Sequence, residues 1–209
     1  NIRMKLELKD IPFEIIGSAS SYSLSFTVEG QELVSIYTTN ASEMGCLFDY
    51  ILGFKPYKSG YISIDGAVVD TQSAAYFRQS MAFVPTHFCE YKESVVDLFH
   101  LHLKANDNKE AHCKEQLKQL LKEIGIDKEL LKQKYWSLTP FEQQAILLCF
   151  SIVSPKDLVL IDHLWCDEEN EEHTIVQYLL NKIREQGSGI LAVTSSEILA
   201  NSGTKRINV

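Results

Sequence analysis

Residues 34–66, VSIYTTNASEMGCLFDYILGFKPYKSGYISIDG, decide the fold because they specify a strand, a polar turn and a helix in direct succession. The β-rich run that ends at Tyr37 is followed by the polar residues 38–42, whose side chains are typical of the N-cap of a helix. Gly53 marks the expected end of that helix. Apolar residues recur through it at helical spacing, namely Met44, Leu47, Phe48, Ile51 and Leu52.

Shorter β-rich runs lie on both sides of this helix. Downstream, residues 61–64 predict a strand that ends at Asp65-Gly66, a dipeptide typical of a hairpin turn. Upstream, residues 6–8, 23–28 and 33–37 alternate apolar and polar side chains. We expect these three runs to form antiparallel strands, the last of which enters the core.

The rest of the chain predicts alternating helices and strands. Residues 157–162 are a nearly continuous apolar run that ends in a carboxylate, which is typical of a parallel strand buried on both faces. With the helix and strand that follow, it predicts a βαβ unit and an α/β fold. The expected elements are a strand at 81–84, helices within 94–134, a helix at 140–153, a strand at 157–162, a helix near 169–186 and a strand at 190–194.

Composition limits the classes of function. The chain has 209 residues and a formal net charge of −8, and its calculated isoelectric point is about 5.3. This balance argues against the broad basic face of a general nucleic-acid binder. The longest apolar stretch is far shorter than the roughly 20 residues of a membrane-spanning helix. We therefore expect a soluble, intracellular protein.

The cysteines are odd in number and far apart in the sequence. None belongs to a CxxC pair or to a His/Cys cluster with metal-ligand spacing, so we expect reduced thiols and no metal site. The five are Cys46, Cys89, Cys113, Cys149 and Cys166.

The order of these elements resembles the ATP-binding cassette of ABC transporters over essentially the whole chain. Residues 34–66 resemble the strand, phosphate loop and helix of the family and its KPxSGxIxIDG stretch. Residues 137–167, SLTPFEQQAILLCFSIVSPKDLVLIDHLWCD, resemble its signature helix and Walker B strand. Residues 83–85 correspond to the Q-loop strand, and residues 190–195 to the strand before the switch histidine.

The resemblance implies a P-loop NTPase-like cassette with a mainly parallel core sheet, an antiparallel β subdomain and a helical subdomain. The chain would form a single domain, 1–209, in which residues 1–86 and 155–209 make the core and about 87–154 make the helical subdomain. It also implies a second cassette and a transmembrane subunit as partners, no nucleic acid, and a cytoplasmic position at the inner face of a membrane.

The phosphate-loop positions have lost the residues that grip a triphosphate. In GxxxxGK[ST], glycines let backbone N–H groups surround the phosphates, the lysine neutralises them and the hydroxyl binds Mg²⁺. Here Thr38 and Glu43 stand at the two glycines, Met44 at the lysine and Gly45 at the hydroxyl residue. Losing two charge-assisted contacts of roughly 1.5–3 kcal/mol each weakens binding on the order of 10² to 10⁴-fold. Any remaining contacts would come from Thr38, Asn40, Ser42, Glu43, Met44, Gly45, Cys46, Thr86 and Asp162.

The other ATP-handling positions are also substituted. Thr86 stands at the Q-loop glutamine, His163 at the general-base glutamate and Ser195 at the switch histidine, whereas Asp162 keeps the metal-facing carboxylate. The adenine-stacking aromatic falls near Ile15, with Phe13 two residues away. Phe13 is interpreted either as a core aromatic or as a base-stacking residue.

The family's LSGGQ signature, which closes over a partner's γ-phosphate, corresponds to residues 138–142. Thr139 can imitate the serine. Pro140 and Phe141 remove an N–H donor and the close backbone approach of glycine, and Glu142 adds negative charge. The whole segment reads Leu138, Thr139, Pro140, Phe141 and Glu142.

Three functions follow from the resemblance and stay open at this stage. The first is a non-hydrolysing cassette that acts structurally or as a regulatory partner, with no cofactor. The second is a divergent ATPase that binds Mg-ATP weakly through Asp162, with His163 or water in place of the glutamate. The third is a cassette-fold scaffold unrelated to transport. The acidic residues 167–172 are interpreted as the start of the following helix.

Overall fold

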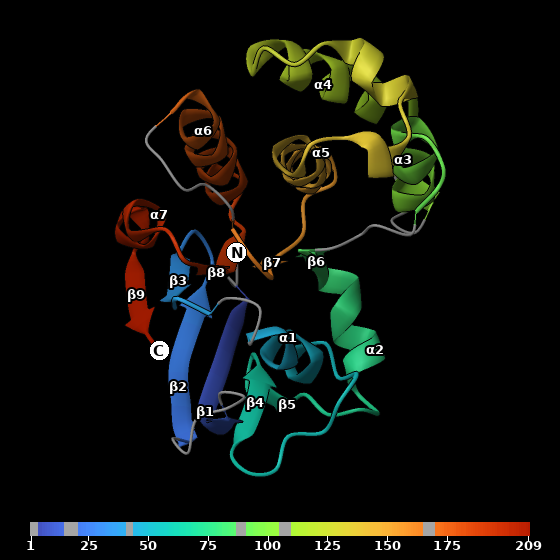
Figure 1. The fold of residues 1–209 in the computed structure, drawn as a ribbon. Helices are drawn as coiled ribbons and strands as arrows, with labels where there is room; N and C mark the ends of the chain where they lie inside the picture. The colour runs from blue at the N-terminus through green and yellow to red at the C-terminus, as the bar shows by residue number, and fades with distance from the viewer. Residues whose placement is uncertain (1–3, 15–20, 41–43, 87–90, 105–109, 165–169) are drawn as a thin grey trace.

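The computed structural model describes residues 4–14, 21–40, 44–86, 91–104, 110–164 and 170–209, and it contains two sheets with helices around them (Figure 1). The larger sheet has five parallel strands in the order β6-β7-β8-β3-β9. The smaller sheet has four antiparallel strands in the order β2-β1-β4-β5. The predicted α/β fold with a parallel core sheet and an antiparallel β part is therefore confirmed.

The strands of the parallel sheet are β3 (Leu33–Tyr37), β6 (Met81–Val84), β7 (Leu158–Ile161), β8 (Gly189–Thr194) and β9 (Lys205–Asn208). The prediction of three antiparallel strands near the N-terminus was wrong for the third. β3 pairs in parallel with β8 on one side and with β9 on the other. Its burial on both faces gives it the environment of a central parallel strand.

The antiparallel sheet consists of β1 (Lys5–Glu14), β2 (Ser21–Glu29), β4 (Tyr61–Ile64) and β5 (Ala67–Val68). Asp65 and Gly66 join the last two strands with φ values of 52° and 82°. Positive φ at both central residues is the requirement of a type I′ hairpin turn, so the predicted hairpin is confirmed.

The helices are α1 (Gly45–Ile51), α2 (Ala74–Phe77), α3 (Val95–Lys104), α4 (Glu110–Glu123), α5 (Pro140–Val153), α6 (Glu171–Glu185) and α7 (Glu197–Ser202). Short 3₁₀ segments cover Arg78–Ser80, Lys128–Lys132 and Tyr135–Ser137. The strand, helix and strand predicted between 157 and 194 correspond to β7, α6 and β8. Because β7 and β8 are parallel neighbours, the predicted βαβ unit is confirmed.

The parallel sheet separates two apolar cores, and the strand alternation explains why its strands read as continuous apolar runs. In β7, Val159 and Ile161 face the core formed with α5 and α6, whereas Leu158 and Leu160 face the core shared with α1 and the antiparallel sheet. Figure 1 shows α5 and α6 on one face of this sheet and α1 on the other.

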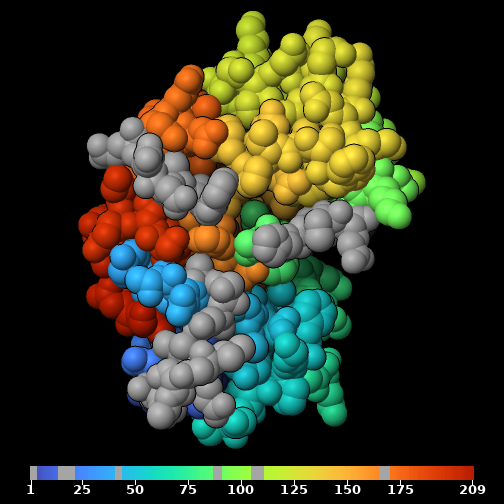
Figure 2. Space-filling view, viewed as in Figure 1, coloured from blue at the N-terminus to red at the C-terminus, as the bar shows by residue number. Residues whose placement is uncertain are grey.

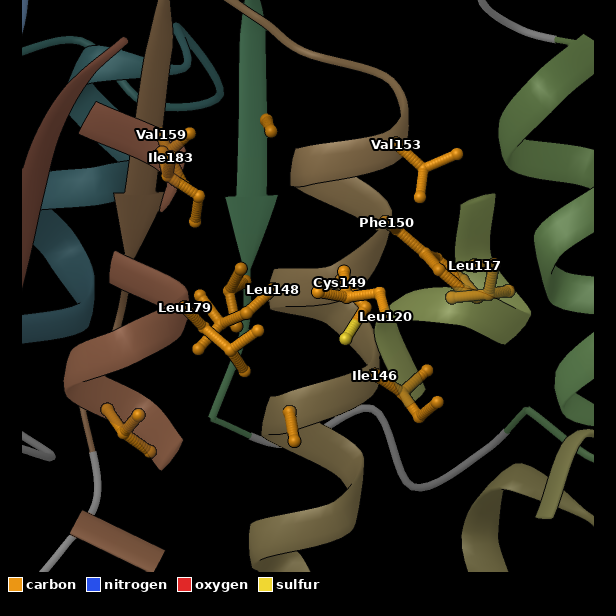
Figure 3. Close-up of a cluster of buried hydrophobic side chains, with 14 of the residues drawn as sticks. Leu117, Leu120, Ile146, Leu148, Cys149, Phe150, Val153, Val159, Leu179 and Ile183 are labelled. Atoms are coloured by element: carbon orange, nitrogen blue, oxygen red, sulfur yellow. The ribbon is translucent and has the colours of Figure 1, made fainter. Parts of the chain in front are cut away.

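Helix α5 lies at the centre of the first core. In Figure 3, its Leu148 points toward Leu179 of α6, while its Phe150 points toward Leu117 of α4. Leu117, Leu120 and Leu121 of α4, and Ile124 just after its end, are buried in this core. Helix α5 therefore packs against both α6 and α4, and these contacts fix its position. Figure 2 shows the residues of α4 and α5 massed at one end of the molecule and those of α1 and β4 at the other.

Of the predicted thiols, Cys46 is free and exposed, and Cys113 and Cys149 are free and buried. Cys89 and Cys166 lie outside the described residues. In the described part of the chain, no group of three or more His, Cys, Asp or Glu side chains is placed to hold a metal ion. Within the same residues, no helix has the length and apolar character needed to span a membrane.

Candidate functional site

The candidate site lies at the carboxyl edge of the parallel sheet. In open α/β sheets, ligands bind outside the carboxyl ends of the strands. Because all five strands are parallel, the residues that follow β3, β6, β7 and β8 meet at this one edge. The fold thereby brings together predicted site residues that are far apart in sequence, namely Thr38, Thr86, Asp162, His163 and Ser195.

Asp162 joins the ends of β6 and β7. The Thr86 hydroxyl donates a hydrogen bond of 2.8 Å to Asp162 Oδ2, and the Thr86 backbone N–H donates to the same oxygen at 3.4 Å. The Asp162 N–H in turn donates to the Val84 carbonyl at 3.0 Å. One oxygen of the predicted metal-facing carboxylate is therefore engaged by the residue at the Q-loop position.

His163 joins the ends of β7 and β8. Its Nε2 lies 3.3 Å from Ser195 Oγ, so the ring nitrogen and the hydroxyl share a hydrogen bond. Gln144 Nε2 of α5 donates to the His163 carbonyl at 2.7 Å. Gln144 is a buried polar residue of α5 for which the sequence pattern gave no signal, and its hydrogen bond holds the backbone of the candidate site.

The turn after β3 begins with a buried threonine. The Thr38 N–H donates to the Thr194 carbonyl at 3.1 Å, and Thr38 Oγ1 accepts from the Asn40 N–H at 3.2 Å. The Thr38 hydroxyl therefore forms its hydrogen bond within its own turn. Ser42 and Glu43, both predicted as site residues, lie outside the described residues.

Met44 packs into the core instead of facing the turn. Its side chain is 1% exposed and belongs to the apolar cluster formed by α1 and the antiparallel sheet. Met44 is also the N-cap residue of α1 and provides no side-chain hydrogen bond. No described residue of the polar stretch 38–42 caps the helix, so the predicted N-cap was wrong for these residues. Gly45 begins α1 with open space around its Cα, and Cys46 is exposed.

Phe13 is 3% exposed within β1, which confirms the core interpretation and contradicts a role in stacking an adenine base. Its neighbour on the paired strand is Tyr22. Ile15 lies outside the described residues.

The segment that resembles the signature forms the N-terminus of α5. A capping box between Thr139 and Glu142 satisfies backbone N–H groups there. The Thr139 N–H donates to Glu142 Oε2 at 2.8 Å, and the Glu142 N–H donates to Thr139 Oγ1 at 3.2 Å. Pro140 occupies the first turn, where a missing N–H costs nothing. Leu138 is buried and Phe141 packs against the α5 core. The spacing of Thr139 and Glu142 is the sequence pattern of a capping box and would have revealed it.

We expect Thr139→Ala to lower the free energy of unfolding by about 1 kcal/mol, because an N-cap hydroxyl contributes roughly that much to a helix. The matched control is Thr139→Ser, which keeps an oxygen that accepts from the Glu142 N–H. Urea denaturation of both variants measures the difference. Equal losses in the two variants would contradict a capping role for this hydroxyl.

The chain is similar to proteins of one known family. The model of the family described as ABC transporter matches residues 22–164. No curated protein matches the chain.

Several solved structures share the fold. The structure of an ATP-binding subunit of an ABC transporter has a TM-score of 0.71 at 20% identity and covers 93% of this chain and 80% of that chain. An ABC transporter ATP-binding protein from Pyrococcus furiosus has a TM-score of 0.73 at 16% identity, over 98% of this chain and 96% of that chain. The cbiO1 protein of Clostridium perfringens, part of the cbiONQ transporter complex, has a TM-score of 0.66 at 15% identity, over 92% and 78% of the two chains.

Proposed function

Because the chain belongs to the ABC transporter family of ATP-binding cassettes, we propose that it is a cassette subunit that does not hydrolyse ATP and acts as a structural or regulatory partner. The single observation that carries this proposal is the position of Met44. The family places there a lysine that neutralises the phosphates, whereas this side chain is buried in the apolar core.

Three contacts of the candidate site support the same proposal. Thr86 engages Asp162, and His163 engages Ser195, so these polar side chains already bond to one another. At the signature segment, Glu142 occupies the N-terminus of α5, where another chain's phosphate would bind. Its carboxylate satisfies that helix end and repels a phosphate.

The described residues do not fit Mg-ATP. Asp162 is the carboxylate retained for the metal, but Gly45 offers no hydroxyl as a second ligand and Met44 offers no cation for the β- and γ-phosphates. We therefore assign no catalytic step to the chain.

One observation favours a second candidate function, a divergent ATPase. Asp162 lies at the carboxyl end of β7, and His163 beside it carries an imidazole within hydrogen-bond distance of a hydroxyl. A neutral imidazole is able to act as a general base near neutral pH. A third candidate, a cassette-fold scaffold unrelated to transport, would form no complex with a membrane protein.

We further propose two partners, a second cassette and a transmembrane subunit, and no nucleic acid. The cbiO1 protein is described as part of a transporter complex, and a similar chain belongs to an inward-facing metal-chelate type ABC transporter. Contact through the helical part, about residues 87–154, would hold this chain at the cytoplasmic face of a membrane. Affinity purification of the native complex with the tagged chain tests these partners, and recovery without any multi-span protein favours the scaffold.

We expect 1 mM Mg-ATP to raise the melting temperature by no more than about 2 °C. A ligand at its own Kd adds about 0.4 kcal/mol, whereas one at 100 times its Kd adds about 2.7 kcal/mol. For a domain of this size each kcal/mol corresponds to roughly 2–4 °C. Differential scanning fluorimetry measures the shift, with magnesium tripolyphosphate at equal ionic strength as the control for general anion effects.

A rise of about 5 °C or more that disappears in Asp162→Asn would contradict the proposal and favour the ATPase. If the chain released phosphate from ATP and the variant His163→Ala did not, the His163 imidazole would be identified as the general base.

A further inference from the structure

A second feature, a cavity lined by both apolar and cationic side chains, lies away from the carboxyl edge of the parallel sheet. A cavity of about 360 Å³ opens between α2 and β6 on one side and α3 and α5 on the other. This size is at the lower end of the range for small-ligand pockets. In Figure 1, the helices α3 and α5 lie above β6 and α2.

Apolar side chains form much of the lining of the cavity. Met81, Phe83 and Phe150 line it, and Phe150 packs against the ring of His102 at 5.5 Å between ring centroids. Phe83 is a partly exposed aromatic on a strand whose other residues are buried. An apolar group entering the cavity would therefore cover surface that water now contacts.

Two cations line the same cavity, and neither forms an ion pair with a carboxylate among the residues that the structure describes. Arg78 Nη1 donates to the Leu52 carbonyl at 2.7 Å, and Lys156 Nζ donates to the Gln79 carbonyl at 2.6 Å. Among the described residues that line the cavity there is no Asp or Glu. In a chain with a net charge of −8, the described lining of this cavity carries cations and neutral groups, and such a lining attracts anions.

The pKa shifts of Lys156 and His102 are consistent with an excess of positive charge in the described lining of the cavity. Burial lowers the pKa of Lys156, and the charge of its neighbour Asp157, which does not line the cavity, opposes this shift only in part. Burial and the charge of Lys156 lower the pKa of His102. Positive charge in the cavity is thus held at a cost that a bound anion would offset.

We propose that this cavity, which we call the Arg78–Lys156 cavity, binds a carboxylate carried on an apolar stem. The stem would contact Phe83 and Phe150, and the carboxylate would accept hydrogen bonds from the guanidinium and ammonium groups. Two sources present this chemistry, a free amphipathic acid and an acidic side chain between apolar residues of a partner protein. The proposal goes beyond the proposed function and does not depend on whether ATP binds.

Methionine methyl NMR tests the proposal directly. The chain has three methionines, and of these Met81 lines the cavity whereas Met44 and Met4 do not, although all three belong to or pack against the same apolar core. In the protein labelled with ¹³C-methyl methionine, we expect 4-phenylbutyrate to shift the Met81 signal and to leave the Met44 signal in place. Its neutral analogue 4-phenylbutanol is the control for apolar binding alone. The peptide acetyl-Ala-Leu-Glu-Leu-Ala-amide and its glutamine analogue probe the partner source in the same way.

We expect the double variant Arg78→Gln/Lys156→Gln to weaken binding of the acidic probe by at least about ten-fold, since a charged hydrogen bond contributes at least that much. Lys122→Gln/Lys128→Gln, which removes two exposed charges outside the cavity, is the matched control and should leave binding unchanged. Lys156→Gln alone, which keeps the Arg78 contact to Leu52, serves if the double variant does not fold.

Each outcome decides the proposal. Binding of 4-phenylbutyrate but not of the peptide supports the free acid, and binding of the glutamate peptide but not of its glutamine analogue supports the partner side chain. Equal binding of the acid and the alcohol, an acid affinity that survives removal of the cations, or no shift of Met81 with either acidic probe overturns it.

Discussion

Replacing Met44 with lysine is expected to lower the free energy of unfolding by about 3–6 kcal/mol and to leave the chain unable to bind Mg-ATP tightly. The native side chain is 1% exposed among apolar residues. An ammonium group buried there loses its hydration, which lowers its folded-state pKa by several units, and each unit corresponds to about 1.4 kcal/mol. Denaturant unfolding measures the loss, and scanning fluorimetry with Mg-ATP measures binding.

The pH dependence provides an internal check of this substitution. The introduced lysine has a lower pKa in the folded state than its unfolded value of about 10.4. The unfolded state therefore binds more protons between these values, and stability recovers as pH rises through that interval. We expect a smaller loss at pH 9.5 than at pH 7. Met44→Leu, which conserves volume, should cost less than about 1.5 kcal/mol. A stable lysine variant that gains tight ATP binding would contradict the fixed inward position of this side chain.

Replacing Phe99 with alanine is expected to lower the free energy of unfolding by about 3–5 kcal/mol. Its side chain is 0% exposed in α3 and its ring lies 5.0 Å from the ring of Phe150 in α5. Truncation removes the buried ring and leaves a cavity between two helices. Guanidinium or urea denaturation gives the change.

The same helix offers a matched control for this loss. Leu101→Ala removes an apolar side chain that is 53% exposed, and it should change stability by no more than about 0.5 kcal/mol. Similar losses for the two variants would contradict the burial of α3 against α5. Because His102 of α3 also lines the Arg78–Lys156 cavity, the Phe99 variant should alter probe binding there as well.

Much of the fold follows from local patterns that the environment reinforces. The run at 157–162 was predictable as a doubly buried strand because helices cover both faces of the sheet and every strand position needs an apolar side chain. Helix α5 has the predicted bounds because Pro140 fits its first turn and its apolar residues continue to Val153.

Elements set by pairing partners were not predictable in this way. The direction of β3 depends on β8 and β9, which follow it by more than 150 residues, and no local signal encodes it. Strand β9 contains a single apolar residue, Ile207, and is held by its ladder with β3. The short helices α2 and α7 are below the length at which periodicity identifies a helix.

The sequence placed the candidate site residues at strand ends, but not their contacts. That Thr86, Asp162, His163 and Ser195 would meet followed from parallel strand order. That they would form two hydrogen-bonded pairs depends on side-chain geometry across neighbouring strands, which has no sequence signature. The inward packing of Met44 was equally a property of the surrounding core.

The place of β3 between β8 and β9 also bears on how the molecule forms during synthesis. Leu33 pairs with Ile190 and Val34 with Lys205, so the two ladders of β3 join the first sixth of the chain to its final part. While the ribosome is still translating the intervening residues, this hydrophobic strand has neither ladder neighbour available. Its ladders form only after β8 and β9 have been synthesised, and pairing across so many residues is expected to slow folding.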